Sequence, residues 1–78
     1  MKIDELCKAL NESCDCITLV RAKGKRMPPK WPRGELLCEN FEGSRVYSYP
    51  TLKVKAWLLA TGLAKVSIHT GSLVPCDD

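Results

Sequence analysis

No apolar run in the sequence approaches the roughly 20 residues needed to cross a bilayer. The first ten residues, MKIDELCKAL, carry acidic side chains at Asp4 and Glu5 and lack the apolar stretch of a signal peptide. The five glycines stand singly, so there is no glycine-rich phosphate loop. These absences argue against a membrane protein or an exported one, and we expect a cytoplasmic protein.

Residues that commonly perform catalysis are also scarce. Glu35 and Glu39 would lie on one strand roughly 13 Å apart, which is too far for a pair of glycosidase carboxylates. His69 is the only histidine, and an alternating strand would turn it outward, away from any nucleophilic cysteine. We therefore expect a protein that is not an enzyme and needs no cofactor.

The cysteines allow two interpretations. Their number, five, is odd, and no export signal favours disulfides. We expect free thiols that lie mostly in or near the core, because reduced cysteine behaves as a small apolar residue. The alternative is a zinc-stabilised interaction module, although structural zinc sites favour two CxxC-like pairs and this sequence has a single CxC. The zinc ligands would come from Cys14, Cys16, Cys38, His69 and Cys76.

What the sequence does contain is typical of one small globular domain spanning residues 1–78. Its apolar fraction is 45% and its charged fraction 27%, which excludes a disordered chain. A chain of this length buries only a modest part of its surface, so we expect a stability of a few kcal/mol.

The first half of the chain predicts a helix followed by a strand. Apolar residues recur at the spacing of one helical face over residues 2–11. The next segment, CITLVRA over residues 16–22, is β-branched and apolar, which is typical of a strand. The residues of the helical face are Ile3, Leu6, Cys7 and Leu10.

The middle of the chain predicts a hairpin and a second helix. Two β-prone segments, residues 34–40 and 44–49, flank a short connection with Gly43. Pro50 suits the start of a helix over TLKVKAWLLAT, and Gly62 suits its end. We expect Leu52, Ala56 and Leu59 to form one face of this helix, with Trp57 on its flank and also in the core.

Residues 63–70 alternate between apolar and polar side chains, which predicts one more strand. Val66 and Ile68 would face the core, whereas Lys65, Ser67 and His69 would face outward. Residues 71–78 have no period, and we expect a coil that forms a C-terminal tail.

The predicted order is α-β-β-β-α-β, which indicates a small α+β fold. An antiparallel or mixed sheet with both helices on one face would bury the apolar stripes. Tyr47 and Tyr49 share one face of this sheet with Arg45, and two arrangements are open. The tyrosines are core residues if the helices cover their face, and otherwise they form an exposed aromatic and basic surface.

Charge is concentrated in one segment. Residues 21–33 hold six basic side chains and no acidic one, whereas the rest of the chain holds six basic and nine acidic side chains. Most of this charge belongs to residues 23–34, KGKRMPPKWPRG, which we call the basic loop. Its three prolines restrict the backbone, and a stiff loop loses less entropy when it binds. The candidate contact residues are Arg21, Lys23, Lys25, Arg26, Lys30, Trp31 and Arg33.

Three roles are open for the basic loop. Its cations could neutralise phosphates of a nucleic acid while Trp31 stacks on a base. They could instead bind an acidic protein, with Trp31 as an anchor. The third possibility is a solvated connection in which Trp31 covers an edge of the sheet.

The segment PRGELLCENFEGSRVYSYPTLKVKAWL, residues 32–58, resembles small orphan proteins of temperate phages and prophages. This resemblance covers about a third of the chain and implies an accessory factor that binds a host or phage component. Two strands followed by a helix with Ala-Trp-Leu are also similar to the arm-type DNA-binding domain of tyrosine integrases, although the basic loop departs from that pattern.

The sequence therefore predicts a small binding protein that contacts nucleic acid or a ribonucleoprotein through its basic loop. The principal alternative is a protein-directed inhibitor of a host complex, such as a defence complex or the transcription machinery. No membrane partner is expected.

Overall fold

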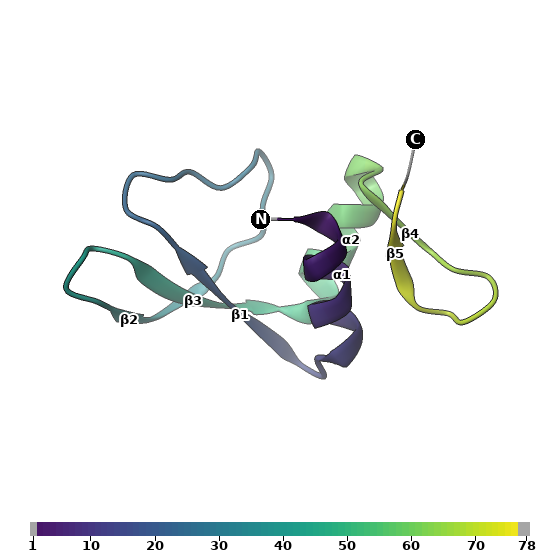
Figure 1. Cartoon of the computed structure of the whole chain (residues 1–78), viewed down its shortest axis with the longest axis horizontal. Coiled ribbons are helices and arrows are strands. Elements are labelled where there is room, and N and C mark those ends of the chain that lie inside the picture. The colour runs from purple at the N-terminus through teal and green to yellow at the C-terminus, as the bar shows by residue number, and fades with distance from the viewer. Residues whose placement is uncertain (1, 77–78) are drawn as a thin grey trace.

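The structure, a computed structural model, describes residues 2–76, which form two helices and five strands (Figure 1). Helix α1 (Ile3–Glu12) forms over the segment that the apolar spacing predicts. Leu6, Cys7 and Leu10 are buried on one of its faces. The predicted first helix is therefore confirmed.

Strands β1 (Cys16–Arg21), β2 (Glu35–Glu39) and β3 (Arg45–Pro50) form an antiparallel sheet in the order β1-β3-β2. In the turn between β2 and β3, the side-chain oxygen of Asn40 accepts hydrogen bonds from two backbone N–H groups. Gly43 follows with a φ of 85°, in the left-handed region that glycine tolerates. The predicted hairpin is confirmed.

Helix α2 (Thr51–Thr61) begins and ends where the sequence predicts. Pro50 is its N-cap residue, where the missing N–H of proline leaves no helical hydrogen bond unmade. Gly62 is its C-cap residue with a φ of 77°, and its N–H donates to carbonyl groups of the last turn.

The buried face of α2 differs from the predicted one. Leu52 and Leu59 are 78% and 44% exposed, and Ala56 is exposed as well. Apolar side chains occur all round this helix, so their spacing does not select a face. The large ring of Trp57 decides which face is buried, because this ring lies beneath the basic loop. The buried residues of α2 are Thr51, Val54, Trp57 and Leu58.

The last part of the chain forms a second hairpin. Strands β4 (Ala64–Val66) and β5 (Leu73–Pro75) pair antiparallel, in place of the predicted single strand over residues 63–70 and the coil after it. The N–H of Ser67 donates to the carbonyl of Ser72 at 2.8 Å, which closes the turn. Residues 77 and 78 of the predicted tail lie outside the described residues.

The prediction that Val66 and Ile68 face the core is therefore wrong. Val66 is 51% exposed and Ile68 is 92% exposed. Ile68 lies in the turn, where alternation no longer sets which way a side chain points. Leu73, from the segment expected to be coil, enters the core instead and is 4% exposed.

Asn11 joins this second hairpin to α1. Its side-chain N–H donates to the carbonyl of Leu73 at 2.9 Å, and its side-chain oxygen accepts from the N–H of Leu73 at 2.8 Å. The amide thus pairs with both polar groups of one backbone residue, as a neighbouring strand would. This contact spans 62 positions of the sequence.

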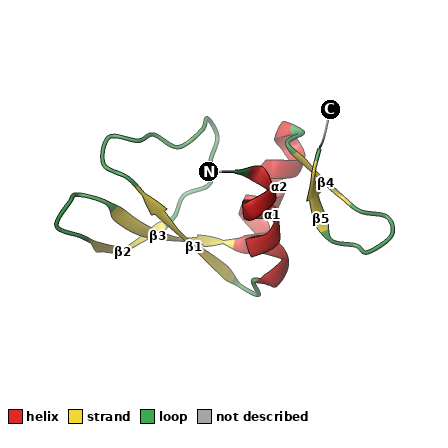
Figure 2. Cartoon of the chain, in the orientation of Figure 1, coloured by secondary structure: helices red, strands yellow, loops and turns green. Residues whose placement is uncertain are grey.

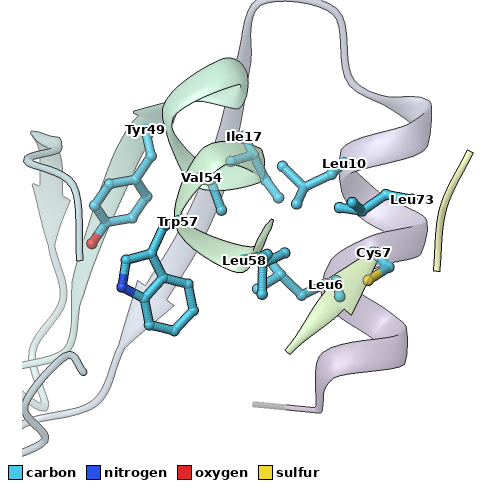
Figure 3. Close-up of a cluster of buried hydrophobic side chains, with 10 residues drawn as sticks. Leu6, Cys7, Leu10, Ile17, Tyr49, Val54, Trp57, Leu58 and Leu73 are labelled. Carbon is cyan, nitrogen blue, oxygen red and sulfur yellow. The ribbon is translucent and has the colours of Figure 1, made fainter. Parts of the chain in front are cut away.

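The two helices lie between the three-stranded sheet and the β4–β5 hairpin (Figure 2). Side chains from both helices meet Ile17 and Tyr49 in one core (Figure 3). Tyr49 is 3% exposed and is a core residue, covered in part by Trp31, whereas Tyr47 on the same face is half-buried. The α+β prediction with antiparallel strands is confirmed, with β5 as an additional strand. No helix among residues 2–76 is long and apolar enough to cross a membrane.

Candidate nucleic-acid interface

The basic loop is held against the core along one side. Met27 and Trp31 are partly buried and pack against the core cluster. The indole N–H of Trp57 donates to the carbonyl of Pro29 at 3.0 Å, which ties the loop to α2. Lys30 has a φ of 65°, an uncommon conformation for a residue with a side chain. The loop therefore takes a defined path over the sheet.

Trp31 is the central contact of the loop with the fold. The centroid of its ring lies 4.8 Å from the ring centroid of Trp57 and 5.5 Å from that of Tyr49, both in edge-to-face geometry. Gly34 closes the loop where a Cβ atom would collide with the ring of Tyr49. The indole N–H of Trp31 is buried and has no acceptor among residues 2–76. Part of Trp31 is thus committed to packing, whatever else it contacts.

The other side of the loop presents its cations to solvent. Five of the six predicted basic residues are exposed, and Arg21 is half-buried at the end of β1. Within residues 2–76 the structure has one ion pair, between Arg45 and Glu39 at 3.7 Å. The six cations therefore have no carboxylate partner in the described chain, and their charge is available to a ligand. The five exposed cations are Lys23, Lys25, Arg26, Lys30 and Arg33.

Arg21 is oriented by the sheet. Its guanidinium donates to the hydroxyl of Tyr47 at 3.2 Å and lies 5.0 Å from the centre of that ring. In the β1–β3 register Arg21 stands directly opposite Arg45. Two like charges in opposite positions destabilise a sheet, so this pair is a local cost that an anion between them would remove. Tyr47, and after it the Glu39 carboxylate, raise the pKa of Arg45 above its ordinary value.

Two hollows lie under and beside the basic loop. The first, which we call the apolar cavity, has a volume of about 410 Å³ and lies between the loop, β1 and the two helices. Three cations, Arg21, Lys25 and Arg26, stand at its margin. Its apolar lining includes Leu6, Leu19, Met27, Trp31, Tyr49 and Trp57.

The second hollow, which we call the basic hollow, has a volume of about 310 Å³ and lies between the start of the loop and the β2–β3 turn. Arg21, Ala22 and Lys25 line both hollows and form the wall between them. Lys23 and Arg45 complete its positive lining, and Glu39 is its single acidic residue.

The structure thus places the seven predicted contact residues in one region, with the cations outward and Trp31 inward. Sequence reasoning missed Arg45 and Tyr47 as members of this region. Their signal was present, because both lie on the predicted strand over residues 44–49 and share a face. The missing information was the β1–β3 register, which brings Arg45 to Arg21.

The cysteines lie elsewhere and are more exposed than expected. Cys7 alone is buried, so the expectation of cysteines mostly in or near the core is wrong. Its pKa is raised by loss of hydration on burial, and further by Asp4 and Cys76. No three His, Cys, Asp or Glu side chains of the described chain lie close enough together to share a metal ion. The exposed cysteines are Cys14, Cys16, Cys38 and Cys76.

This difference in exposure predicts two classes of thiol. At about pH 8 in native conditions we expect the four exposed thiols to react rapidly with a soluble disulfide reagent, because reaction needs an accessible thiolate. Cys7 should react only as fast as the protein opens. A release assay under native conditions and again in denaturant measures both classes. Five rapid thiols would contradict the burial of Cys7, and fewer than five in denaturant would reveal a disulfide.

Comparisons of the chain with protein family models, curated proteins and solved structures find no match.

Proposed function

We propose that this chain is a non-enzymatic binding protein that contacts nucleic acid, or a ribonucleoprotein that presents it, through the basic loop and Arg21. One observation carries the proposal: the five cations of the basic loop and Arg21 have no carboxylate partner among residues 2–76, while the loop is fixed to the core by Trp31 and the Trp57–Pro29 hydrogen bond. Unpaired cations on a held loop suit a polyanion, because the loop backbone loses little freedom on binding.

The opposition of Arg21 and Arg45 supports phosphate as the contacted group. A phosphate in the basic hollow would lie among Arg21, Lys23, Lys25 and Arg45, and would relieve the repulsion between the two arginines. An accessory role of the phage type, in which the protein acts by contact rather than by catalysis, is consistent with this proposal.

The test is the salt dependence of binding to DNA and RNA of unrelated sequences. Each phosphate contact on duplex DNA contributes about 0.9 to the log–log slope of affinity against salt. Replacing Lys25, Arg26, Lys30 and Arg33 by serine should therefore flatten the slope by up to about 3.6 (0.9 for each of four phosphates). Fluorescence anisotropy with labelled oligonucleotides at several salt concentrations measures the slopes.

A matched control removes the same charge from elsewhere on the surface. The variant with serine at Lys8, Lys53, Lys55 and Lys65 has the same net charge as the loop variant, but changes no residue of the two hollows. It should keep most of the wild-type slope, since contact position as well as net charge sets the number of phosphates neutralised. Equal losses of slope in the two variants would mean that binding is unspecific electrostatic attraction. Absence of binding by the wild-type protein would contradict the proposal.

The alternative is a protein-directed inhibitor. It is favoured by exposed apolar side chains on β1, on β2 and in the turn after β2, with Val20 at 64%, Leu37 at 52% and Phe41 at 110% exposure. Such residues are typical of a protein interface when they lie together. A pull-down from host lysate with and without nuclease separates the two functions: capture that survives nuclease and fails in the loop variant supports a protein partner.

A further inference from the structure

We infer that the ligand is single-stranded, and that one unpaired base enters the apolar cavity while a phosphate beside it lies in the basic hollow. This inference rests on the proposed function, because it names the form of nucleic acid and the site of each part of one nucleotide. Its new element is the base in the apolar cavity, which is tested separately from the salt-dependent phosphate contact.

The apolar cavity fits a flat aromatic group. Trp31 is the partly exposed ring in its lining, and the buried rings of Tyr49 and Trp57 support it from behind. The volume of about 410 Å³ lies within the range of small-molecule sites. Aromatic side chains bind bases of any sequence by stacking, since every base has a π-face. A base in a duplex is covered on both faces and paired at its edge, so it enters such a cavity only after it leaves the stack. The cavity therefore favours single strands.

The wall between the hollows fixes how the nucleotide lies. Arg21 and Lys25 line both hollows, so a ligand that fills the apolar cavity keeps its anionic part within reach of these two cations. Arg21 is already oriented by its hydrogen bond to Tyr47. The apolar cavity on one side of the wall suits a base, and the basic hollow on the other side suits the phosphate of the same nucleotide.

The charge around the cavity argues for a strand rather than a single small anion. A lone amphipathic anion needs cations at one point of the margin. Here exposed cations continue along the basic loop beyond both hollows, at Lys30 and Arg33. A line of positive charge beside an aromatic cavity matches the grooves in which single-stranded nucleic acids bind.

The first experiment compares strands that differ only in their bases. Labelled oligothymidylate and oligouridylate of about 12 nucleotides are titrated with the wild-type protein, next to the same strands with abasic positions and next to a duplex. We expect the abasic strand and the duplex to bind roughly 10- to 100-fold more weakly than the intact strand, as loss of base stacking predicts. The intact strand should also quench tryptophan fluorescence, because Trp31 and Trp57 line the cavity. A tighter complex with either intact strand supports the inference and identifies the preferred sugar.

The second experiment fills the cavity. Met27→Trp adds bulk to the lining of the apolar cavity and leaves the basic hollow unchanged, because Met27 lines only the former. This variant should bind the intact strand as weakly as the wild type binds the abasic strand, with duplex binding unaltered. Leu52→Trp is the matched control, since Leu52 is 78% exposed on α2 and lines neither hollow. Circular dichroism checks that both variants are folded. The comparison with the abasic strand uses the wild-type protein and does not depend on either variant.

The outcomes separate the two claims. Equal affinity for intact strand, abasic strand and duplex, with a steep salt slope, would overturn the inference and leave the phosphate proposal standing. Absence of binding to every strand would overturn both. Full binding of the intact strand by folded Met27→Trp would exclude the apolar cavity as the base site.

Discussion

Replacing Trp57 by alanine is expected to lower the free energy of unfolding by about 3–5 kcal/mol, as for other buried tryptophans. Trp57 is 9% exposed, its ring packs edge-to-face on Trp31, and its N–H holds the carbonyl of Pro29. The variant loses both contacts and the buried surface of the ring, and it leaves a space beneath the basic loop. Since a domain of this size has only a few kcal/mol of stability, we expect it to be partly unfolded in water. Urea denaturation followed by circular dichroism measures the loss.

Trp57→Phe separates packing from the hydrogen bond. Phenylalanine keeps much of the buried ring and removes the donor to Pro29, so we expect a loss of about 1 kcal/mol in addition to a small packing term. Leu52→Ala is the control on the exposed face of the same helix. If Trp57→Ala is no more destabilising than Leu52→Ala, then α2 buries the face that the sequence pattern predicted.

The second large effect is expected at Leu73. Replacing this buried leucine by alanine should cost about 2–5 kcal/mol, through lost burial and the cavity left behind. Ile68→Ala should change stability by less than about 0.5 kcal/mol, because Ile68 is 92% exposed in the turn. The same urea denaturation measures both. The reverse order would mean that residues 63–70 form one strand with Ile68 inward.

The parts of the fold that were predicted correctly are those that local chemistry decides. The apolar stripe of α1, the proline before α2 and the glycine after it each act within one or two turns of chain. The hairpin turn at Gly43 is equally local. These features do not depend on what the rest of the molecule does.

The incorrect predictions needed tertiary information. Leu52 and Val54 are equally apolar, and only the position of the sheet and loop decides that Val54 is buried. The alternation over residues 63–70 is genuine in the sequence, but the turn that ends β4 at Val66 depends on pairing with β5. A short strand of this kind gains its stability from its partner, which a pattern of single residues does not reveal.

The charge of the candidate site was predicted from the sequence, but its shape was not. Six cations without an intervening acid are evident in the sequence, whereas the apolar cavity depends on where Trp31 packs. The opposition of Arg21 and Arg45 depends on the register of β1 on β3. The bulge between Leu36 and Cys38 in β2 likewise brings Glu39 beside Arg45. No pattern of residues in the sequence predicts this bulge.

The hydrogen bonds between Asn11 and Leu73 bear on the order in which the protein folds during synthesis. The nascent chain presents the apolar face of α1 long before β5 has been translated, because 62 positions separate the two partners. Leu6 and Leu10 therefore stay without their final cover while the sheet and α2 emerge. We expect the closure of β5 on the first helix to come late in folding, because such a distant contact is slow to form. Ribosome-bound chains arrested before Leu73 should accordingly remain open to proteases at α1.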